Sequence, residues 1–165
     1  FFVELQSLWG RAQIEAGADA LWLGDCSASG HLISLDDYQD YAAEGVRACA
    51  RAYADAGGIT IYHASEHNLA HICAQAATGI DALSVGPGVD IAAVKQAVGD
   101  RVCIVGNLDP IAVLQDATPA QVRAETQRIV TVGIGRVEWM RTGFSLRWSG
   151  GGSGCFFKRF DFLLH

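Results

Sequence analysis

The sequence lacks the features that identify several large classes of protein. It contains no apolar run close to the ~20 residues that a membrane-spanning helix needs. It has no block of Lys or Arg in its main body, as a nucleic-acid or anionic-membrane surface would require. It also has no Gly-x-Gly-x-x-Gly motif, no Gly-rich phosphate loop and no nucleophile elbow. Nothing therefore supports a membrane protein, a nucleic-acid-binding protein, a dinucleotide-binding enzyme or an α/β-hydrolase.

The cysteines show no disulfide pattern and no Cys-x-x-Cys pair. An odd, scattered set of five favours free thiols in a reducing compartment. The first three residues include neither an initiator Met nor the basic flank of a signal peptide. We therefore expect a cytoplasmic protein that is represented here by a fragment. The cysteines are Cys26, Cys49, Cys73, Cys103 and Cys155.

What is present is an apolar, acidic chain whose final segment differs from the rest. Of the 165 residues, 50% are hydrophobic and 18% are charged, which is typical of a soluble α/β domain. Residues 1–135 carry 16 acidic and 7 basic side chains, whereas residues 136–165 carry 2 acidic and 5 basic ones. Residues 133–165 follow neither helical nor strand periodicity. We expect a partial barrel domain over residues 1–132 and an atypical tail over 133–165, either disordered or irregular at the surface or translated out of frame.

Short apolar segments alternate with helical ones along residues 1–132. The apolar segments 18–24, 58–63, 82–85 and 101–106 are typical of strands buried on both faces of a parallel sheet. Helices are expected at 3–16, 34–56, 68–78, 90–98 and from 118 onward. This alternation predicts right-handed βαβ units, in either an open doubly wound sheet or part of a (β/α)₈ barrel. A complete barrel takes about 250 residues, so four units make roughly half of one.

Polar residues gather at the carboxyl ends of the predicted strands, where parallel α/β folds place their ligand sites. Asp25 is a candidate catalytic carboxylate, although an Asp in this position also starts ordinary Asx turns. His63 is a candidate acid, base or metal ligand, against the alternative of a histidine bonded to neighbouring backbone. Candidate substrate-binding residues at the same ends are Ser27, Ser29, Gly30, Asn107 and Asp109.

At this point several segments resemble one known family, the uroporphyrinogen decarboxylase superfamily. The resemblance is carried by Gln13–Asp25 with the following Ala-Ser-Gly-His-Leu-Ile-Ser loop, by Thr78–Leu83 with Val89-Asp90, by Gly99–Pro110 and by Thr118–Ile129. These segments cover about residues 8–132 in order. The resemblance implies an α/β fold, namely the C-terminal half of a (β/α)₈ TIM barrel.

The superfamily has two enzymatic branches, and the resemblance leaves both open. One branch comprises uroporphyrinogen decarboxylases of haem biosynthesis, which use no cofactor. The other comprises zinc-dependent methylcobamide:coenzyme M methyltransferases, and the loop at residues 28–34 is more similar to that branch. Its His-x-Cys zinc motif matches at His63, but Ser65 stands at the Cys position. The remaining candidate ligands are Glu66, His67 and, in a Gly-Cys turn like that of the branch, Cys155.

The resemblance therefore implies part of a corrinoid-dependent methyltransferase that passes a methyl group from a methylcobamide to a thiol, with zinc as the cofactor. Uroporphyrinogen decarboxylase is the alternative, and a non-catalytic remnant is a third. Expected partners are a corrinoid protein or a tetrapyrrole substrate and a small thiol, with no nucleic acid and no membrane. A half barrel leaves sheet edges unpaired, so a homodimer is also expected.

Overall fold

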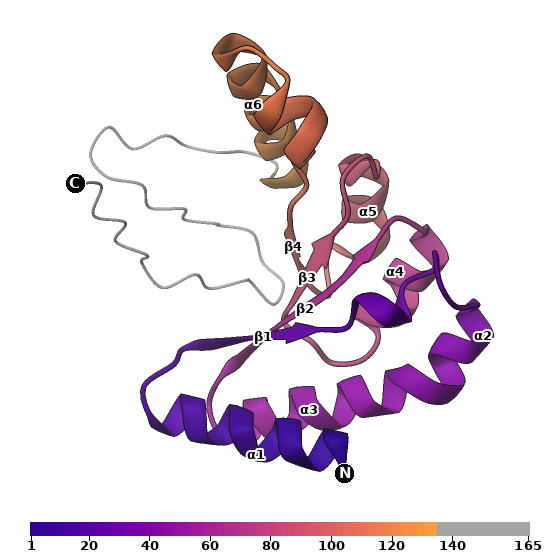
Figure 1. Cartoon of the computed structure of the whole chain (residues 1–165), viewed down its shortest axis with the longest axis vertical. Helices are drawn as coiled ribbons and strands as arrows, with labels where there is room; N and C mark the ends of the chain where they lie inside the picture. The colour runs from indigo at the N-terminus through magenta and orange to yellow at the C-terminus, as the bar shows by residue number, and fades with distance from the viewer. Residues whose placement is uncertain (135–165) are drawn as a thin grey trace.

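The computed structural model describes residues 1–134 and shows four parallel strands alternating with helices (Figure 1). This confirms the predicted α/β class. The strands lie in the order β1-β2-β3-β4, and each is hydrogen-bonded to the next in the chain. The elements are α1 (Phe2–Glu15), β1 (Ala20–Gly24), α2 (Leu35–Asp37), α3 (Ala43–Asp55), β2 (Ile59–Glu66), α4 (Leu69–Ala76), β3 (Ala82–Val85), α5 (Ile91–Val98), β4 (Cys103–Val105) and α6 (Pro119–Ile134), with short turns η1 (Cys26–Ala28), η2 (Tyr38–Ala42) and η3 (Pro110–Gln115).

Local capping residues set the starts of the helices as the sequence predicts. The Asp90 carboxylate accepts the Ala92 N–H at 2.9 Å at the start of α5. At the start of α6, the Gln121 side chain accepts the Thr118 N–H at 2.8 Å. Each bond satisfies a backbone donor that the first helical turn leaves free.

The predicted helix over 34–56 forms as one run in which α2 passes through η2 into α3. Ser34 caps it by accepting the Asp37 N–H at 3.0 Å. The turn η2 is π-helical, with wider i→i+5 hydrogen bonding than an α-helix. It begins at Tyr38, whose side chain is fully buried.

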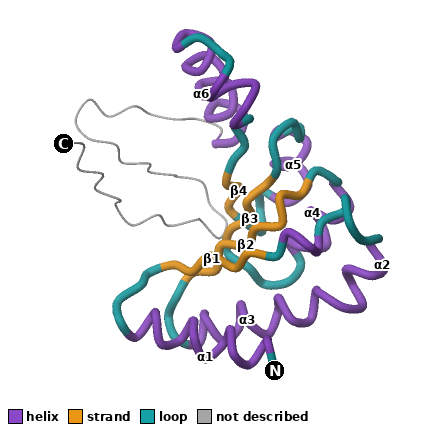
Figure 2. Tube along the Cα trace, viewed as in Figure 1, coloured by secondary structure: helices purple, strands orange, loops and turns teal. Residues whose placement is uncertain are grey.

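The core lies between the sheet and the helices on one side of it (Figure 2). Alternation along β2 explains this, since Tyr62 and Ala64 are fully buried while Ile61 and His63 are only half-buried. The main cluster joins Tyr62 to side chains of α3, α4, α5 and α6. The opposite sheet face, which carries Ile61 and His63, is therefore the one left for a functional site.

Within residues 1–134, no helix is both long enough and apolar enough to cross a membrane. The predicted tail over 133–165 lies outside the described residues, apart from the two that end α6. Its boundary at residue 132 therefore stays a prediction.

Candidate functional site

His63 lies at the centre of the sheet face opposite the helices. The parallel register pairs Gly24 of β1 with His63 of β2, and His63 with Ser84 of β3. Side chains paired in this way point to the same face. Trp22, two residues before Gly24, stacks its ring on the imidazole with centroids 4.8 Å apart.

Both ring nitrogens of His63 meet side-chain hydroxyls. Nδ1 lies 3.0 Å from Ser84 Oγ, and Nε2 lies 2.9 Å from Ser65 Oγ. When Nδ1 carries the proton and donates to Ser84, Nε2 holds the lone pair and accepts from Ser65. The arrangement holds the imidazole so that it can exchange a proton at Nε2.

Strand β2 continues three residues beyond its predicted end at His63, and its register shifts between His63 and Glu66. Ser65 has a φ of +51°, an uncommon backbone conformation for a side-chain-bearing residue. This irregularity keeps the Ser65 hydroxyl at His63. Glu66 follows on the other face, in keeping with the burial pattern of β2, and is 1% exposed.

Both oxygens of the Glu66 carboxylate accept hydrogen bonds from backbone N–H groups. Oε2 accepts the Gly30 N–H at 2.7 Å, while Oε1 accepts the His67 N–H at 2.8 Å and the Asn68 N–H at 2.7 Å. Burial without these bonds would be costly for a carboxylate, and the three bonds offset that cost. Glu66 therefore ties the loop after β1 to the loop after β2.

The two histidines that follow do not share a helix face. His67 precedes α4, and its Nδ1 lies 2.7 Å from Nε2 of His31. His71 lies inside α4 and is buried, and neither of its ring nitrogens has a hydrogen-bond partner among the described residues. The four-residue spacing of His67 and His71 thus brings no pair together.

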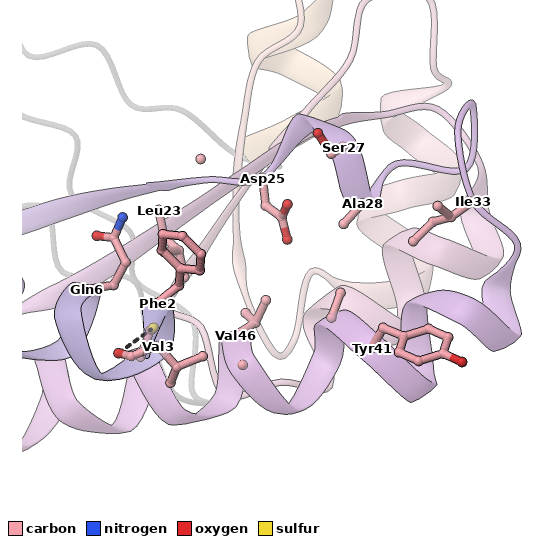
Figure 3. Close-up of a pocket in the computed structure, with 14 residues that line it drawn as sticks. Phe2, Val3, Gln6, Leu23, Asp25, Ser27, Ala28, Ile33, Tyr41 and Val46 are labelled. Atoms are coloured by element: carbon pink, nitrogen blue, oxygen red, sulfur yellow. Dashed lines mark hydrogen bonds between the residues drawn. The ribbon is translucent and has the colours of Figure 1, made fainter.

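Asp25 lies in a pocket of about 400 Å³ on the helix side of β1, which Figure 3 shows. Tyr62 donates its hydroxyl to Asp25 Oδ2 at 3.3 Å. Burial raises the pKa of Asp25 above its ordinary value, and the Tyr62 hydrogen bond opposes this in part. Ser27 lines the same pocket, whose other walls are mainly apolar and include Phe2, Val3, Leu23, Ile33 and Val46.

The other predicted binding residues make contacts within the fold. Asn107 donates through Nδ2 to the Gly86 carbonyl at 2.9 Å and the Val89 carbonyl at 3.0 Å. Asp109 caps η3 by accepting the N–H groups of Ile111 and Ala112 at 2.8 Å. Ser29 is buried beside Gly30, whose N–H goes to Glu66.

The structure thus separates the two predicted catalytic residues. His63, with Ser65 and Ser84, lies on the open sheet face, and Asp25 lies with Ser27 in the pocket behind β1. Sequence reasoning missed Trp22 and Tyr62. Strict alternation along the strands would have found both. Trp22 is two residues before Gly24 and so lies on the same face as His63, whereas Tyr62 directly precedes His63 and so lies on the opposite face.

The described residues at His63 do not fit zinc. A hydroxyl is a poor zinc ligand, Glu66 is bound to backbone, and His67 is paired with His31. Within residues 1–134, no group of three His, Cys, Asp or Glu side chains could hold a metal ion. Cys155 lies outside the described residues.

Comparison with known proteins gives one family and two kinds of relative. Residues 3–139 match the family described as Uroporphyrinogen decarboxylase (URO-D). A uroporphyrinogen decarboxylase of Chlorobium phaeovibrioides is 40% identical over 123 residues, which are 72% of this chain and 33% of that protein. The methylcobamide:CoM methyltransferase MtbA of Methanosarcina mazei is 32% identical over 137 residues, which are 82% of this chain and 40% of that protein.

A solved methyltransferase from Methanosarcina mazei has the same fold over the matched part. It aligns with a TM-score of 0.73 at 23% sequence identity, and covers 79% of this chain and 38% of that one. The chain spans a third to two fifths of the length of these relatives. Its four strands are part of the TIM barrel that the family forms.

Proposed function

This chain belongs to the uroporphyrinogen decarboxylase family, and from that premise we propose that it is part of a corrinoid-dependent methyltransferase. The substrates would be a methylated corrinoid and a small thiol. The proposal places His63 at the reacting thiol and leaves Asp25 in the separate pocket behind β1.

One observation carries the proposal. His63 and Ser65 present Nε2 and Oγ to each other at 2.9 Å from the end of β2. In the methyltransferase branch that this chain resembles, a His-x-Cys pair at this strand end provides two zinc ligands. The same two positions converge here, with oxygen in place of sulfur. The match to MtbA, which extends over 82% of the chain, supports the same branch.

Because zinc does not fit the described residues, the chemistry we assign to His63 is a proton transfer. With Nδ1 bonded to Ser84, Nε2 accepts the proton of the bound thiol as the S–H bond breaks. The sulfur then forms a bond to the methyl carbon while the cobalt–carbon bond breaks and its electron pair stays on cobalt. A free thiol has a pKa near ~8.5 and an imidazole near ~6.5, so deprotonation needs the thiol held close to Nε2.

The test is thiol-dependent demethylation of methylcobalamin by the 165-residue protein, followed by absorbance. We expect activity that His63→Ala lowers at least tenfold and that a chelator leaves unchanged. His31→Ala is the matched control, since it removes a histidine from the loop after β1 whose ring pairs with His67 and not with His63. Demethylation that is absent, or that His63→Ala leaves intact, would contradict the proposal.

A second experiment tests the ligand geometry itself. Ser65→Cys exchanges one atom beside His63 Nε2 and should create a histidine–thiolate pair. We expect Ser65→Cys to bind Zn²⁺ at least tenfold more tightly than Ser84→Cys, which places its sulfur at Nδ1. Equal affinities in the two variants would show that this strand end does not keep the branch's geometry.

Uroporphyrinogen decarboxylation is the second candidate, supported by the 40% identity to the Chlorobium enzyme and by the poor fit to zinc. It predicts release of CO₂ from uroporphyrinogen on the acid side of neutrality, without metal. Decarboxylation that a chelator abolishes would exclude this candidate, and decarboxylation without methyl transfer would replace our proposal with it.

A further inference from the structure

Two histidines from separate loops meet beyond the carboxyl ends of β1 and β2. His31, in the loop after β1, places Nε2 at 2.7 Å from Nδ1 of His67, in the loop after β2. The rings meet edge to face with centroids 4.6 Å apart. Two imidazole nitrogens this close, on residues 36 apart in the chain, are a chelating pair if both present lone pairs.

The backbone beside both histidines is fixed by one carboxylate. Glu66 accepts the N–H of Gly30, which precedes His31, and also the N–H of His67 itself. Glu66 is 1% exposed, so these bonds form away from competing water. The two ligand positions are therefore held before any ion arrives, which lowers the entropy cost of binding.

Two glycines make room for this arrangement. A Cβ on Gly30 would lie 3.0 Å from His71 Nδ1 and 3.2 Å from Glu66 Oε1, so only glycine allows the loop to approach the carboxylate without displacement. A Cβ on Gly86 would overlap the His67 ring, which is seated against that backbone. The ring of His67 thus has packing on one side and His31 on the other.

We propose that His31 and His67 form a binding site for one divalent ion of the nickel and copper class. With metal–nitrogen bonds of about 2.0 Å, two ligands at right angles lie about 2.8 Å apart, and two tetrahedral ligands lie about 3.3 Å apart. The hydrogen-bonded separation of 2.7 Å in the metal-free pair is nearer to the right-angled case, which square-planar and octahedral ions provide. This site is independent of the proposed function, which rests on His63.

Water completes the coordination, since within residues 1–134 no third His, Cys, Asp or Glu joins the pair. In the metal-free pair one ring donates its N–H to the other. On binding, that ring moves the proton to its second nitrogen, so that both facing nitrogens offer lone pairs to the ion.

Calorimetric titration of the 165-residue protein with NiCl₂ at pH 7.5, in the presence of a non-thiol reductant, tests the site. We expect one Ni²⁺ per chain, bound more tightly than Zn²⁺ under the same conditions. His31→Ala and His67→Ala should each weaken Ni²⁺ binding at least tenfold. His63→Ala, the matched control, should leave it within twofold.

Thermal melts by circular dichroism separate loss of the site from loss of the fold. His31→Gln, which keeps a polar side chain of similar size at an exposed position, should melt like the wild type and still bind Ni²⁺ poorly. Wild-type affinity in His31→Gln, a stoichiometry of zero, or tighter binding of Zn²⁺ than of Ni²⁺ would each overturn the proposal.

Discussion

Asp25 is a carboxyl group held in a mainly apolar pocket with one hydroxyl donor. Burial raises its pKa, and Tyr62 lowers it by a smaller amount. The pKa of Tyr62 is itself raised by burial, so Tyr62 remains a donor at neutral pH. The folded protein therefore binds a proton at Asp25 more tightly than the unfolded chain does.

The raised pKa of Asp25 determines whether its contribution to stability rises or falls with pH. The contribution of Asp25 is fully favourable below the pKa of the unfolded chain and is lost as pH rises through the raised folded pKa. We predict that Asp25→Asn raises the urea midpoint at pH 7 and that the gain shrinks toward pH 4. Asp19→Asn, at an exposed position before β1, is the control and should show neither effect. A midpoint that falls at pH 7 would contradict the assignment.

The candidate site was predictable residue by residue only in part. His63 and Asp25 could be found because each comes at the end of a predicted apolar strand. The sequence suggested one shared site, but the structure places His63 beside Ser84 and Asp25 in the pocket behind β1. The extra length of β2, which the sequence did not predict, brings Ser65 and Glu66 into the strand. The pairing of His31 with His67 depends on two loops far apart in the chain, for which no local pattern exists.

Helices α1 and α3 pack closely because α1 has a glycine where they cross. Gly10 is buried, and a Cβ there would overlap the ring of Tyr53 in α3. Tyr53 is also fixed, since its hydroxyl donates to the Gln6 carbonyl at 3.3 Å and its side chain is 2% exposed. The ring therefore has little freedom to move aside.

We predict that Gly10→Ala destabilises the protein by up to about 2 kcal/mol, because overpacking of about 1–3 kcal/mol outweighs the gain in helix propensity of about 1 kcal/mol. Gly45→Ala in α3 is the matched control. Its Cβ would approach only Val3 Cγ2, at 3.2 Å on an exposed side chain near the chain start. Gly45→Ala should be neutral or stabilising. Urea unfolding measures both, and a Gly10→Ala protein as stable as the wild type would show that the two helices can separate at no cost.

Element starts were predictable because caps act locally, as Asp90 and Thr118 show. The two π-helical turns, η2 and η3, could not be predicted from the sequence. Wider hydrogen bonding at Tyr38–Ala42 accommodates the burial of Tyr38, and that burial depends on the packed neighbours and not on composition. At Pro110–Gln115 the Asp109 side chain caps the turn by accepting the N–H groups of Ile111 and Ala112.

At the scale of the molecule, the described sheet has two edge strands, β1 and β4, and an open face. Trp22 on that face is 57% exposed, and its ring lies on the imidazole of His63. The alternation of short apolar and helical segments correctly predicted a parallel sheet, because strands joined by helical crossovers run in the same direction. Which groups pair with the edge strands β1 and β4 is not determined by the sequence of any one βαβ unit.

We predict that the 17.6 kDa chain self-associates through its edge strands. Light scattering after size exclusion should give twice the chain mass at high concentration and a lower value on dilution. Trp22→Lys should shift the equilibrium toward monomer, while Trp9→Lys, at an exposed position in α1, should not. A monomer at all concentrations with a cooperative melt would contradict this prediction.

The Glu66 carboxylate also links two parts of the chain that are distant in sequence, since its bond to Gly30 spans 36 residues. That bond can form only after β1, α3 and β2 have assembled, so it belongs to the folded unit and not to either loop alone. The Gly30 amide sits in an exposed loop, yet its proton should exchange with solvent only when the whole β1–β2 unit opens. An amide in a surface loop should therefore exchange as slowly as the amides of the core.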